Sequence, residues 1–269
     1  MKKDNTMNLF RSLIAGAAAL ALTACGGSDD NVLKLGAIAG PEAQVAEVAA
    51  ELAKQQFGLE VEVVPFTDYV TPNAALNDGS IDINAFQHRP YLEGQVEARG
   101  YQLVAVANTF VYPIAAYSSK IRSLDELNIG DKVALPNDPT NLGRSLVLLE
   151  KQGLLTLKPG AGINATPRDI IDNPKQIEIL ELEAAQLPRA LQDVSFAIIN
   201  NTFAGQAGLT LEKDGLFVEA KDSPYVNLIV ARTNNQDDPR IAQFIQAYQS
   251  DAVYQKAQEL FSGNIVKGW

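Results

Sequence analysis

The chain has 269 residues, of which 46% are hydrophobic and 20% are charged, so its composition is that of a globular protein and not of a disordered or fibrous one. Its 32 acidic residues outnumber its 22 basic residues, and the net charge of −10 argues against binding to the phosphate backbone of nucleic acid. One cysteine and one histidine exclude a disulfide framework, a multi-cysteine zinc site and any metal site that needs two histidines.

The amino terminus has the pattern of a secretory signal. Two lysines within the first three residues precede an uncharged run, Leu13–Leu22, which is shorter than the roughly 20 residues that span a bilayer. The run ends in Leu-Thr-Ala-Cys, which resembles a bacterial lipobox, whose cysteine is acylated and becomes the new amino terminus. The sequence therefore predicts a signal peptide over residues 1–24, and a lipidated Cys25 with a tether over residues 25–31. The alternative is an ordinary signal peptide, in which case the position of the chain's one cysteine would be a coincidence.

Strand and helix patterns alternate from residue 32 onward. Proline at the helix starts and glycine at the helix ends mark the boundaries of the expected helices. The first segments whose apolar residues fit strands are 32–38, 59–64, 80–84 and 103–110, and the helices expected between them are 41–57, 71–78 and 90–99.

The same signals continue to the carboxyl end. Further strands are expected over 113–118, 132–136, 177–182, 195–200 and 225–232. The expected helices begin at Thr140 or Asn141 and at Thr166-Pro167, with short helices near 186–192 and 202–207 and one long closing helix over 239–261.

This alternation predicts an α/β fold with mainly parallel sheets flanked by helices, and the length fits two such sheets better than one. The predicted lobes are residues 32–112 plus 233–269 for lobe 1 and residues 113–232 for lobe 2. In open α/β sheets ligands bind beyond the carboxyl ends of the strands, so two lobes place the site in the cleft between them.

The sequence offers little for catalysis. It contains no nucleophile elbow and no phosphate-binding loop, Cys25 is assigned to the anchor, and no nucleophile is recognisable as a partner for His88. The sequence therefore predicts a binding protein and not an enzyme, with no cofactor and no metal. An exported hydrolase or isomerase on the same scaffold is the alternative.

Aromatic side chains follow two neighbouring strands of the predicted first lobe. Phe66 and Tyr69 come after one strand, and Phe86, His88 and Tyr91 after the next. Such a cluster suits a soft apolar group, because sulfur–aromatic contacts contribute about 0.3–1.5 kcal/mol each. The polar tips of the tyrosines and of the histidine favour a binding site over a core. For Phe66 the two interpretations are balanced.

Arg144 lies in the first turn of an expected helix, where a cation opposes the helix dipole by about 0.3–1 kcal/mol. A ligand carboxylate held by both the guanidinium and the helix amino terminus would offset that cost. A salt bridge to Asp138 or simple exposure to solvent are the alternatives.

Three asparagines are further candidates. Asn200 and Asn201 follow an expected strand, and Asn227 lies inside the apolar run YVNLIVAR. A buried amide without partners is costly, so Asn227 either faces the cleft and contacts a ligand or bonds a neighbouring loop.

Taken together, these segments resemble the methionine-binding lipoproteins of bacterial ABC importers, the NlpA-type family. The resemblance covers nearly the whole chain beyond the signal peptide, in order. The matching stretches are FTDYVTPN (66–73), DGSIDINAFQHRPYL (78–92), LPNDPTNLGRSLVLLEKQGL (135–154), TPRDIIDNP (166–174), LEAAQLPRAL (182–191), SPYVNLIVAR (223–232) and VKGW (266–269).

The resemblance implies a two-lobed periplasmic binding protein of type II that closes over free methionine, with L-methionine favoured, and delivers it to a permease driven by an ATPase. It implies export and anchoring on the periplasmic side of a membrane through Cys25, with inner or outer membrane left open. A methionyl dipeptide or another small amino acid is the alternative ligand.

The resemblance also implies roles for individual residues. Tyr69, Phe86, His88 and Tyr91 would surround the thioether, with Phe66 as a weaker member, while Arg144 would hold the α-carboxylate and Asn200 and Asn227 the amino-acid head group. Where this chain reads Asn-Asn-Thr-Phe from residue 200, family members often read Asn-Thr-Asn-Tyr or Asn-Thr-Thr-Tyr, so Asn201 is also a candidate partner of the ammonium.

Overall fold

Strand β1 (Val32–Ile38) opens the part of the chain that the computed structural model describes, residues 32–221 and 223–269. The predicted signal peptide, the predicted lipidation site at Cys25 and the predicted tether lie outside the described residues. The described strands form two large sheets and one two-stranded ribbon. Within the described residues, no helix combines the length and the apolar character needed to cross a bilayer.

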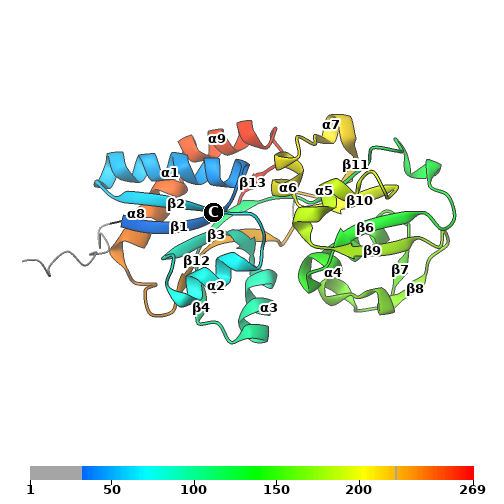
Figure 1. The fold of residues 1–269 in the computed structure, drawn as a ribbon, viewed down its shortest axis with the longest axis horizontal. Coiled ribbons are helices and arrows are strands. Elements are labelled where there is room, and N and C mark those ends of the chain that lie inside the picture. Colours follow the sequence, from blue (N-terminus) through cyan, green and yellow to red (C-terminus); the bar gives the residue numbers. More distant parts are fainter. Residues whose placement is uncertain (1–31, 222) are drawn as a thin grey trace, which may run out of the picture. The chain divides into compact units, whose positions relative to one another are not determined.

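The first sheet has six strands in the order β13-β4-β12-β3-β1-β2 (Figure 1). Strand β1 pairs in parallel with β2 and β3, whereas β12 runs antiparallel to β3 and β4, and β13 antiparallel to β4. The bounds of its other strands are β2 (Glu60–Phe66), β3 (Ile83–His88), β4 (Leu103–Val111), β12 (Val226–Arg232) and β13 (Val266–Lys267).

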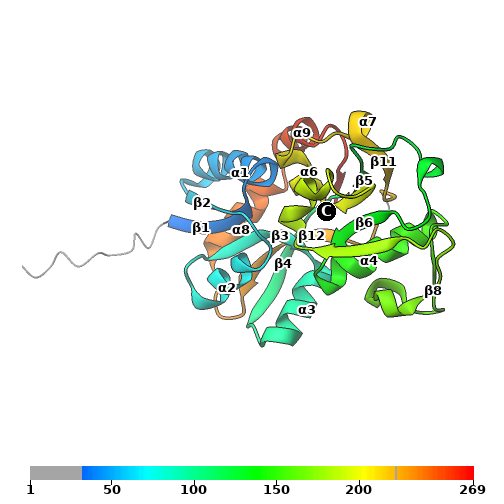
Figure 2. The same ribbon diagram turned by 45° about the vertical axis from the view of Figure 1, so that its right-hand side comes forward.

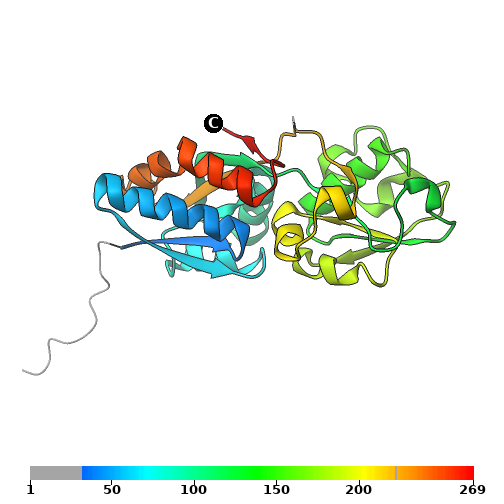
Figure 3. The ribbon, with the colours of Figure 1, turned by 90° about the horizontal axis from the view of Figure 1, so that it is seen from above.

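Helices cover both faces of this sheet (Figures 1 and 3). Helix α1 lies against α8 and α9 on one face, and α2 and α3 pack on the other. Their bounds are α1 (Pro41–Phe57), α2 (Thr71–Asp78), α3 (Arg89–Arg99), α8 (Pro239–Tyr248) and α9 (Asp251–Leu260).

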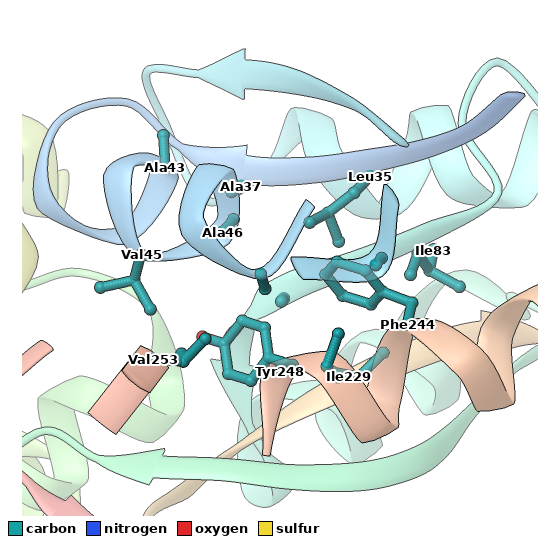
Figure 4. Packing of buried hydrophobic residues seen from close by; sticks show 14 of the residues in the cluster. Leu35, Ala37, Ala43, Val45, Ala46, Ile83, Ile229, Phe244, Tyr248 and Val253 are labelled. Atoms are coloured by element: carbon teal, nitrogen blue, oxygen red, sulfur yellow. The ribbon is translucent and has the colours of Figure 1, made fainter. Parts of the chain in front are cut away.

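The alternation of side chains along β12 shows how the two faces are filled. Ile229 belongs to the core under α1 and α8, whereas Leu228 and Val230 belong to the core under α2 and α3. Figure 4 shows the first of these cores, in which Phe244 and Tyr248 of α8 meet side chains of the sheet. A strand buried on both faces in this way reads as a continuous apolar run.

The second sheet has five strands in the order β11-β5-β10-β6-β9. Strand β6 is parallel to β9 and β10, and β5 is antiparallel to β10 and β11. The bounds of the strands in this part are β5 (Ala115–Tyr117), β6 (Lys132–Pro136), β9 (Glu178–Leu182), β10 (Phe196–Ile199) and β11 (Gly215–Val218), with β7 (Thr156–Leu157) and β8 (Ile170–Asp172) forming the ribbon.

Short helices connect these strands. The α-helices are α4 (Pro139–Lys151), α5 (Leu187–Ala190), α6 (Asn201–Gln206) and α7 (Leu211–Asp214), and the 3₁₀ turns are η1 (Leu124–Glu126), η2 (Gly162–Asn164), η3 (Pro167–Asp169) and η4 (Ala184–Gln186). Helix α4 contacts α3 of the first sheet, so the two large sheets meet beside these helices (Figure 2). The chain passes between the sheets twice, over residues 112–114 between β4 and β5 and again between β11 and β12, where residues 219–221 and 223–225 are described.

Several expectations about the fold were wrong. Both sheets are mixed and not mainly parallel, because β12 runs antiparallel to β3 and β4 in the first sheet and β5 runs antiparallel to β10 and β11 in the second. The segment Val226–Arg232, assigned to lobe 2, is strand β12 of the first sheet, so the chain returns to that sheet before Val226 and not after Arg232.

Two expected helices also differ. The predicted helix over residues 239–261 is broken into α8 and α9, because the Ser250 hydroxyl accepts a hydrogen bond from the Val253 amide and starts a new helix. Thr166 does form a capping box with Asp169, but only the single turn η3 follows before β8 begins.

Gly143 in α4 allows the helix to approach η2 closely, because a methyl group at that position would overlap the backbone carbonyl group of Ile163. We expect Gly143→Ala to destabilise the protein by about 1–3 kcal/mol in denaturant unfolding, since a backbone obstacle cannot rotate away. Gly94→Ala in α3 is the control, because its methyl group would lie 3.8 Å from Thr140 Cγ2. The control should be neutral or stabilising by about 0.5–1 kcal/mol, as expected for an unhindered helix position. Equal effects of the two substitutions would contradict the close approach.

Candidate functional site

A cavity lies where the carboxyl end of β3 and the start of β12 meet the amino-terminal ends of α4 and α6. Its lining combines aromatic rings with amides and a few ionisable groups. The lining residues are Glu42, Tyr69, Phe86, Gln87, His88, Tyr91, Tyr112, Asn141, Arg144, Asn200, Asn201, Thr202 and Asn227. All the predicted ligand-binding residues except Phe66 are among them.

Three rings form the aromatic wall of the cavity. The ring centroid of Tyr69 lies 5.8 Å from that of Phe86 and 6.1 Å from that of Tyr91. The Tyr91 hydroxyl donates to the Tyr69 carbonyl oxygen over 2.7 Å, and Phe203 lies behind Tyr69 with a centroid distance of 4.8 Å. Burial raises the pKa values of both tyrosines, so their hydroxyls remain neutral. The wall is therefore apolar in its bulk and uncharged at its polar tips.

Phe66 does not line the cavity. It ends β2 opposite Ile38 of β1, and its ring packs in the apolar cores on either side, close above Gly36. A side chain on Gly36 would collide with this ring, which explains why glycine stands there. Phe66 therefore packs in the core beside the cavity, and its contribution to ligand binding stays a prediction.

His88 is a neutral connector at the end of β3. Its Nδ1 accepts a hydrogen bond from the Tyr91 amide at 3.2 Å and caps α3, so Nε2 carries the proton and donates to Asn141 Oδ1, also at 3.2 Å. Burial and the nearby Arg144 lower the pKa of His88 to about 3. The ring therefore adds no charge to the cavity at physiological pH.

Asn141 joins the two halves of the site, and the sequence analysis considered it only as a helix cap. Its Oδ1 accepts from His88 on one sheet and, over 3.1 Å, from Nδ2 of Asn200, which follows β10 of the other. Its Nδ2 donates to Asp138 Oδ2 over 2.9 Å. Asp138, and not Thr140 or Asn141, caps α4, since its Oδ1 accepts from the Asn141 amide.

Arg144 is 3% exposed and is held by both segments that pass between the sheets. Its Nε donates to Glu219 Oε1 over 3.0 Å, and its Nη2 donates to Glu219 Oε2 and to the Tyr112 carbonyl oxygen. The Tyr225 ring lies 4.2 Å from the guanidinium carbon. Glu219, not Asp138, is thus its ion-pair partner. Nη1 forms no hydrogen bond with a described residue, and the Arg144 side chain is among those that line the cavity.

The three asparagines occupy the polar side of the cavity. Asn227 donates to the Phe86 carbonyl oxygen over 3.0 Å, in register with His88 of β3. Asn201 donates to the Asn264 carbonyl oxygen over 2.9 Å. Asn200 donates to Asn141, while its own Oδ1 has no hydrogen-bond partner among the described residues. All three are at most 8% exposed, so each amide is shielded from bulk water.

Glu42 and Gln87 also line the cavity, although neither is among the residues that the sequence predicts for the site. Glu42, in the first turn of α1, is 4% exposed, and its burial raises the pKa to about 8. Gln87 belongs to a buried amide cluster behind the cavity, in which it exchanges hydrogen bonds with Asn73 and donates to Asn84. A signal for Gln87 existed, because an amide between aromatic residues in an apolar strand needs buried partners.

A mixed six-stranded sheet and a mixed five-stranded sheet, joined by two crossing segments and enclosing a cavity lined from both, define a two-lobed periplasmic binding protein. The family model described as NlpA lipoprotein matches residues 33–269. The chain belongs to the NlpA lipoprotein family.

The chain aligns with relatives of high identity over nearly the full length of both proteins. A protein of Vibrio cholerae named probable D-methionine-binding lipoprotein MetQ is 59% identical over 260 residues, which cover 96% of this chain and 97% of the relative. The Escherichia coli K12 protein named D-methionine-binding lipoprotein MetQ is 58% identical over 264 residues, with 97% of each chain covered.

Solved structures show the same fold. A crystal structure of the methionine-binding protein MetQ superposes with a TM-score of 0.88 at 60% identity and covers 89% of this chain and 98% of the other. A nutrient-binding protein from Burkholderia cenocepacia, solved bound to methionine, has a TM-score of 0.86 at 46% identity and covers 88% of this chain and 100% of the other.

The low pKa of His88 predicts a specific acid sensitivity. Below pH 6.5 the unfolded chain binds a proton on His88 that the folded chain does not bind until about pH 3, so this group makes the protein less stable as the pH falls. Between pH 7 and pH 5 the loss from His88 should be about 2 kcal/mol.

The variant His88→Gln keeps a hydrogen-bonding side chain but has no imidazole to protonate. We expect its unfolding free energy to fall by about 2 kcal/mol less than that of the wild type between pH 7 and pH 5, in urea titrations at both values. His88 is the chain's one histidine, so no other imidazole contributes. Identical pH dependence of the two proteins would show that the folded state protonates His88 normally.

Proposed function

We propose that this protein is a lipid-anchored binding protein that captures methionine and delivers it to an ABC-type importer. The observation that carries the proposal is the composition of one cavity, in which the aromatic wall of Tyr69, Phe86 and Tyr91 and the buried Arg144 line the same space. These are the two features that a zwitterion with a thioether tail requires.

In this proposal the thioether lies against the aromatic wall, next to the neutral His88. Burial of the three or four heavy atoms of the tail contributes roughly 2–3 kcal/mol, and sulfur–aromatic contacts add to it. The α-carboxylate accepts from Arg144 Nη1 in a charge-assisted hydrogen bond, which contributes about 1.5–3 kcal/mol. Asn200, Asn201 and Asn227 supply amides for the rest of the head group.

The two lobes would close over the ligand. We assign β1–β4, β12, β13 and their helices to lobe 1, and residues 113–225 to lobe 2, with the two crossing segments as the hinge. Asn141 supports this assignment, because its single amide oxygen accepts from His88 of one lobe and from Asn200 of the other. Closure excludes water from the cavity and so strengthens the bonds to the ligand.

The partners follow from the family. Several relatives are named as D-methionine-binding lipoproteins, and a solved structure is named as a methionine-binding protein. We propose that Cys25 carries the lipid anchor and that an ABC permease with its ATPase receives the ligand, on the periplasmic side of the membrane. The role is binding and transport, not catalysis.

The stereochemistry of the ligand needs a direct test. L-methionine is the ligand favoured by the family resemblance, whereas the relatives from V. cholerae and E. coli are named for D-methionine. The methionine-bound neighbour supports a single amino acid as ligand. A methionyl dipeptide would have to fit its second residue within the same walls.

Isothermal titration calorimetry with L-methionine, D-methionine, norleucine, alanine and a methionyl dipeptide tests the proposal. We expect micromolar or tighter binding of methionine, weaker binding of norleucine, and weak or no binding of alanine, because alanine leaves the aromatic wall without a partner. Native mass spectrometry of the freshly purified protein would identify a ligand retained from the cell. The absence of binding to either methionine enantiomer would refute the function.

Arg144→Lys tests the carboxylate site. Lysine keeps the positive charge beside Glu219. It lacks the planar guanidinium, so it cannot donate hydrogen bonds to Glu219, to the Tyr112 carbonyl oxygen and to a ligand at the same time. We expect methionine affinity to fall at least roughly tenfold in calorimetry, as the loss of one charge-assisted hydrogen bond implies.

Arg122→Lys is the matched control for this substitution. Arg122 is exposed, bonds the Lys213 carbonyl oxygen and is not among the residues that line the cavity. The control should bind methionine with wild-type affinity. If Arg144→Lys also binds within twofold of the wild type, the guanidinium does not hold the ligand.

A further inference from the structure

Two oxygen atoms in the cavity lack hydrogen-bond partners among the described residues. They are Oε2 of Glu42 and Oδ1 of Asn200, and both side chains line the cavity. A buried polar atom that forms no hydrogen bond costs free energy, so a ligand that satisfies both atoms gains affinity by doing so. An ammonium group has three donors and no acceptor, and therefore matches a pair of free acceptors.

The orientation of the Asn200 amide is fixed by its neighbours. Asp138 can only accept when ionised, so the Asn141 nitrogen faces Asp138 and the Asn141 oxygen faces the cavity network. The Asn200 nitrogen must then face that oxygen, which turns the Asn200 oxygen away from Asn141. The free acceptor at Asn200 thus follows from the whole chain of amides and not from a single rotamer.

Glu42 has no cation beside it. No ion pair joins it to a described residue. Its Oε1 accepts one long hydrogen bond, 3.5 Å from Asn227 Nδ2, and a hydrogen bond with the Thr202 side chain offsets part of the pKa rise that burial causes. The titratable groups that face it are Tyr69 after β2, Tyr112 after β4 and Tyr248 on α8, all with raised pKa values, and Thr202 of α6 offers a neutral hydroxyl. Asp138, like Glu42, raises the pKa of Tyr69, whereas Arg144 lowers it.

We propose that Glu42 is the anionic partner of the ligand's ammonium group, and that the ligand binds in exchange for a proton held by Glu42. This inference rests on the proposed function, because it takes an amino acid as the ligand. In the empty protein the carboxyl group is protonated. On binding, its O–H bond breaks, the proton leaves to water, and the carboxylate with Asn200 Oδ1 accepts hydrogen bonds from the ammonium. Asn227 orients the carboxylate through Oε1.

The exchange makes affinity depend on pH with a defined sign. Because protons compete with the ammonium for Glu42, binding weakens as the pH falls below the pKa of about 8 in the empty protein. Simple competition predicts that affinity rises about tenfold from pH 6 to pH 7 and about fivefold from pH 7 to pH 8. His88 does not contribute in this range, since its pKa of about 3 keeps it neutral.

Calorimetry of L-methionine binding at pH 7 in phosphate and in Tris measures the proton directly. The two buffers differ in ionisation enthalpy, so the observed heats differ in proportion to the protons released. We expect the wild type to release close to one proton, and Glu42→Gln to release none. Glu47→Gln is the matched control, because Glu47 lies exposed on the same helix and outside the cavity, and it should behave as the wild type.

A ligand-side comparison tests the contact itself. The hydroxy acid analogue of methionine replaces the ammonium by a neutral hydroxyl. The wild type at pH 8 should prefer methionine over this analogue by on the order of tenfold or more, and Glu42→Gln should lose most of that preference. Thermal unfolding without ligand checks that the variant folds, and an amide at this position should be tolerated because the empty site already holds a neutral group.

The outcomes separate this inference from the proposed function. Failure of the wild type to bind methionine refutes the function. If the wild type binds methionine but releases no proton, or if Glu42→Gln keeps both the proton release and the preference for the ammonium, then Glu42 is not the ammonium partner and the function stands. The buffer comparison on the wild type needs no variant, so it decides the proton exchange even if Glu42→Gln does not fold.

Discussion

The burial of one guanidinium group is the constraint on which this structure depends. A cation that is 3% exposed must be paired, and Arg144 is paired with Glu219. Glu219 and the Tyr112 carbonyl oxygen lie on the two segments that connect the sheets, so the same bonds that neutralise Arg144 also fix both connections beside the cavity. The site and the hinge proposed for the lobes are therefore parts of one network, and a ligand that binds Arg144 acts on both.

Much of the fold could be predicted from local sequence, because proline and glycine mark the element ends. Strands β1 and β6 and helix α1 have the predicted bounds. The predictions that were wrong concerned features that depend on contacts between residues distant in sequence or on single hydrogen bonds. Strand β12 reads as an apolar run in any sheet, and only its pairing with β3 and β4 assigns it to the first. The break between α8 and α9 depended on whether the Ser250 hydroxyl would bond the backbone, which periodicity does not show.

The site was predictable where residue type conflicts with its local setting, as with an arginine in the first turn of a helix or an amide inside an apolar strand. Glu42 gave no such signal, because an acidic residue in the first turn of a helix is favourable and common, and its burial arises only when α6, β12 and α8 pack around it. Asn141 was seen as a cap, and its bridging role required both sheets to be in place. Phe66 shows the opposite: its position in the sequence suggested the site, but its ring packs in the core beside it.

An empty cavity that selects a doubly charged ligand poses a problem of stability, because unpaired charges are costly where water is excluded. This protein meets it by three means. Arg144 is paired internally with Glu219, His88 is neutral because burial lowers its pKa, and burial raises the pKa of Glu42 so that it holds a proton at pH 7. On the proposals above, a zwitterion reverses the balance, since it brings an anion for Arg144 and a cation for Glu42. Selectivity for a ligand with both charges follows, because a ligand that lacks the ammonium leaves Glu42 protonated and Asn200 Oδ1 unsatisfied, and one that lacks the carboxylate leaves Arg144 Nη1 without an acceptor.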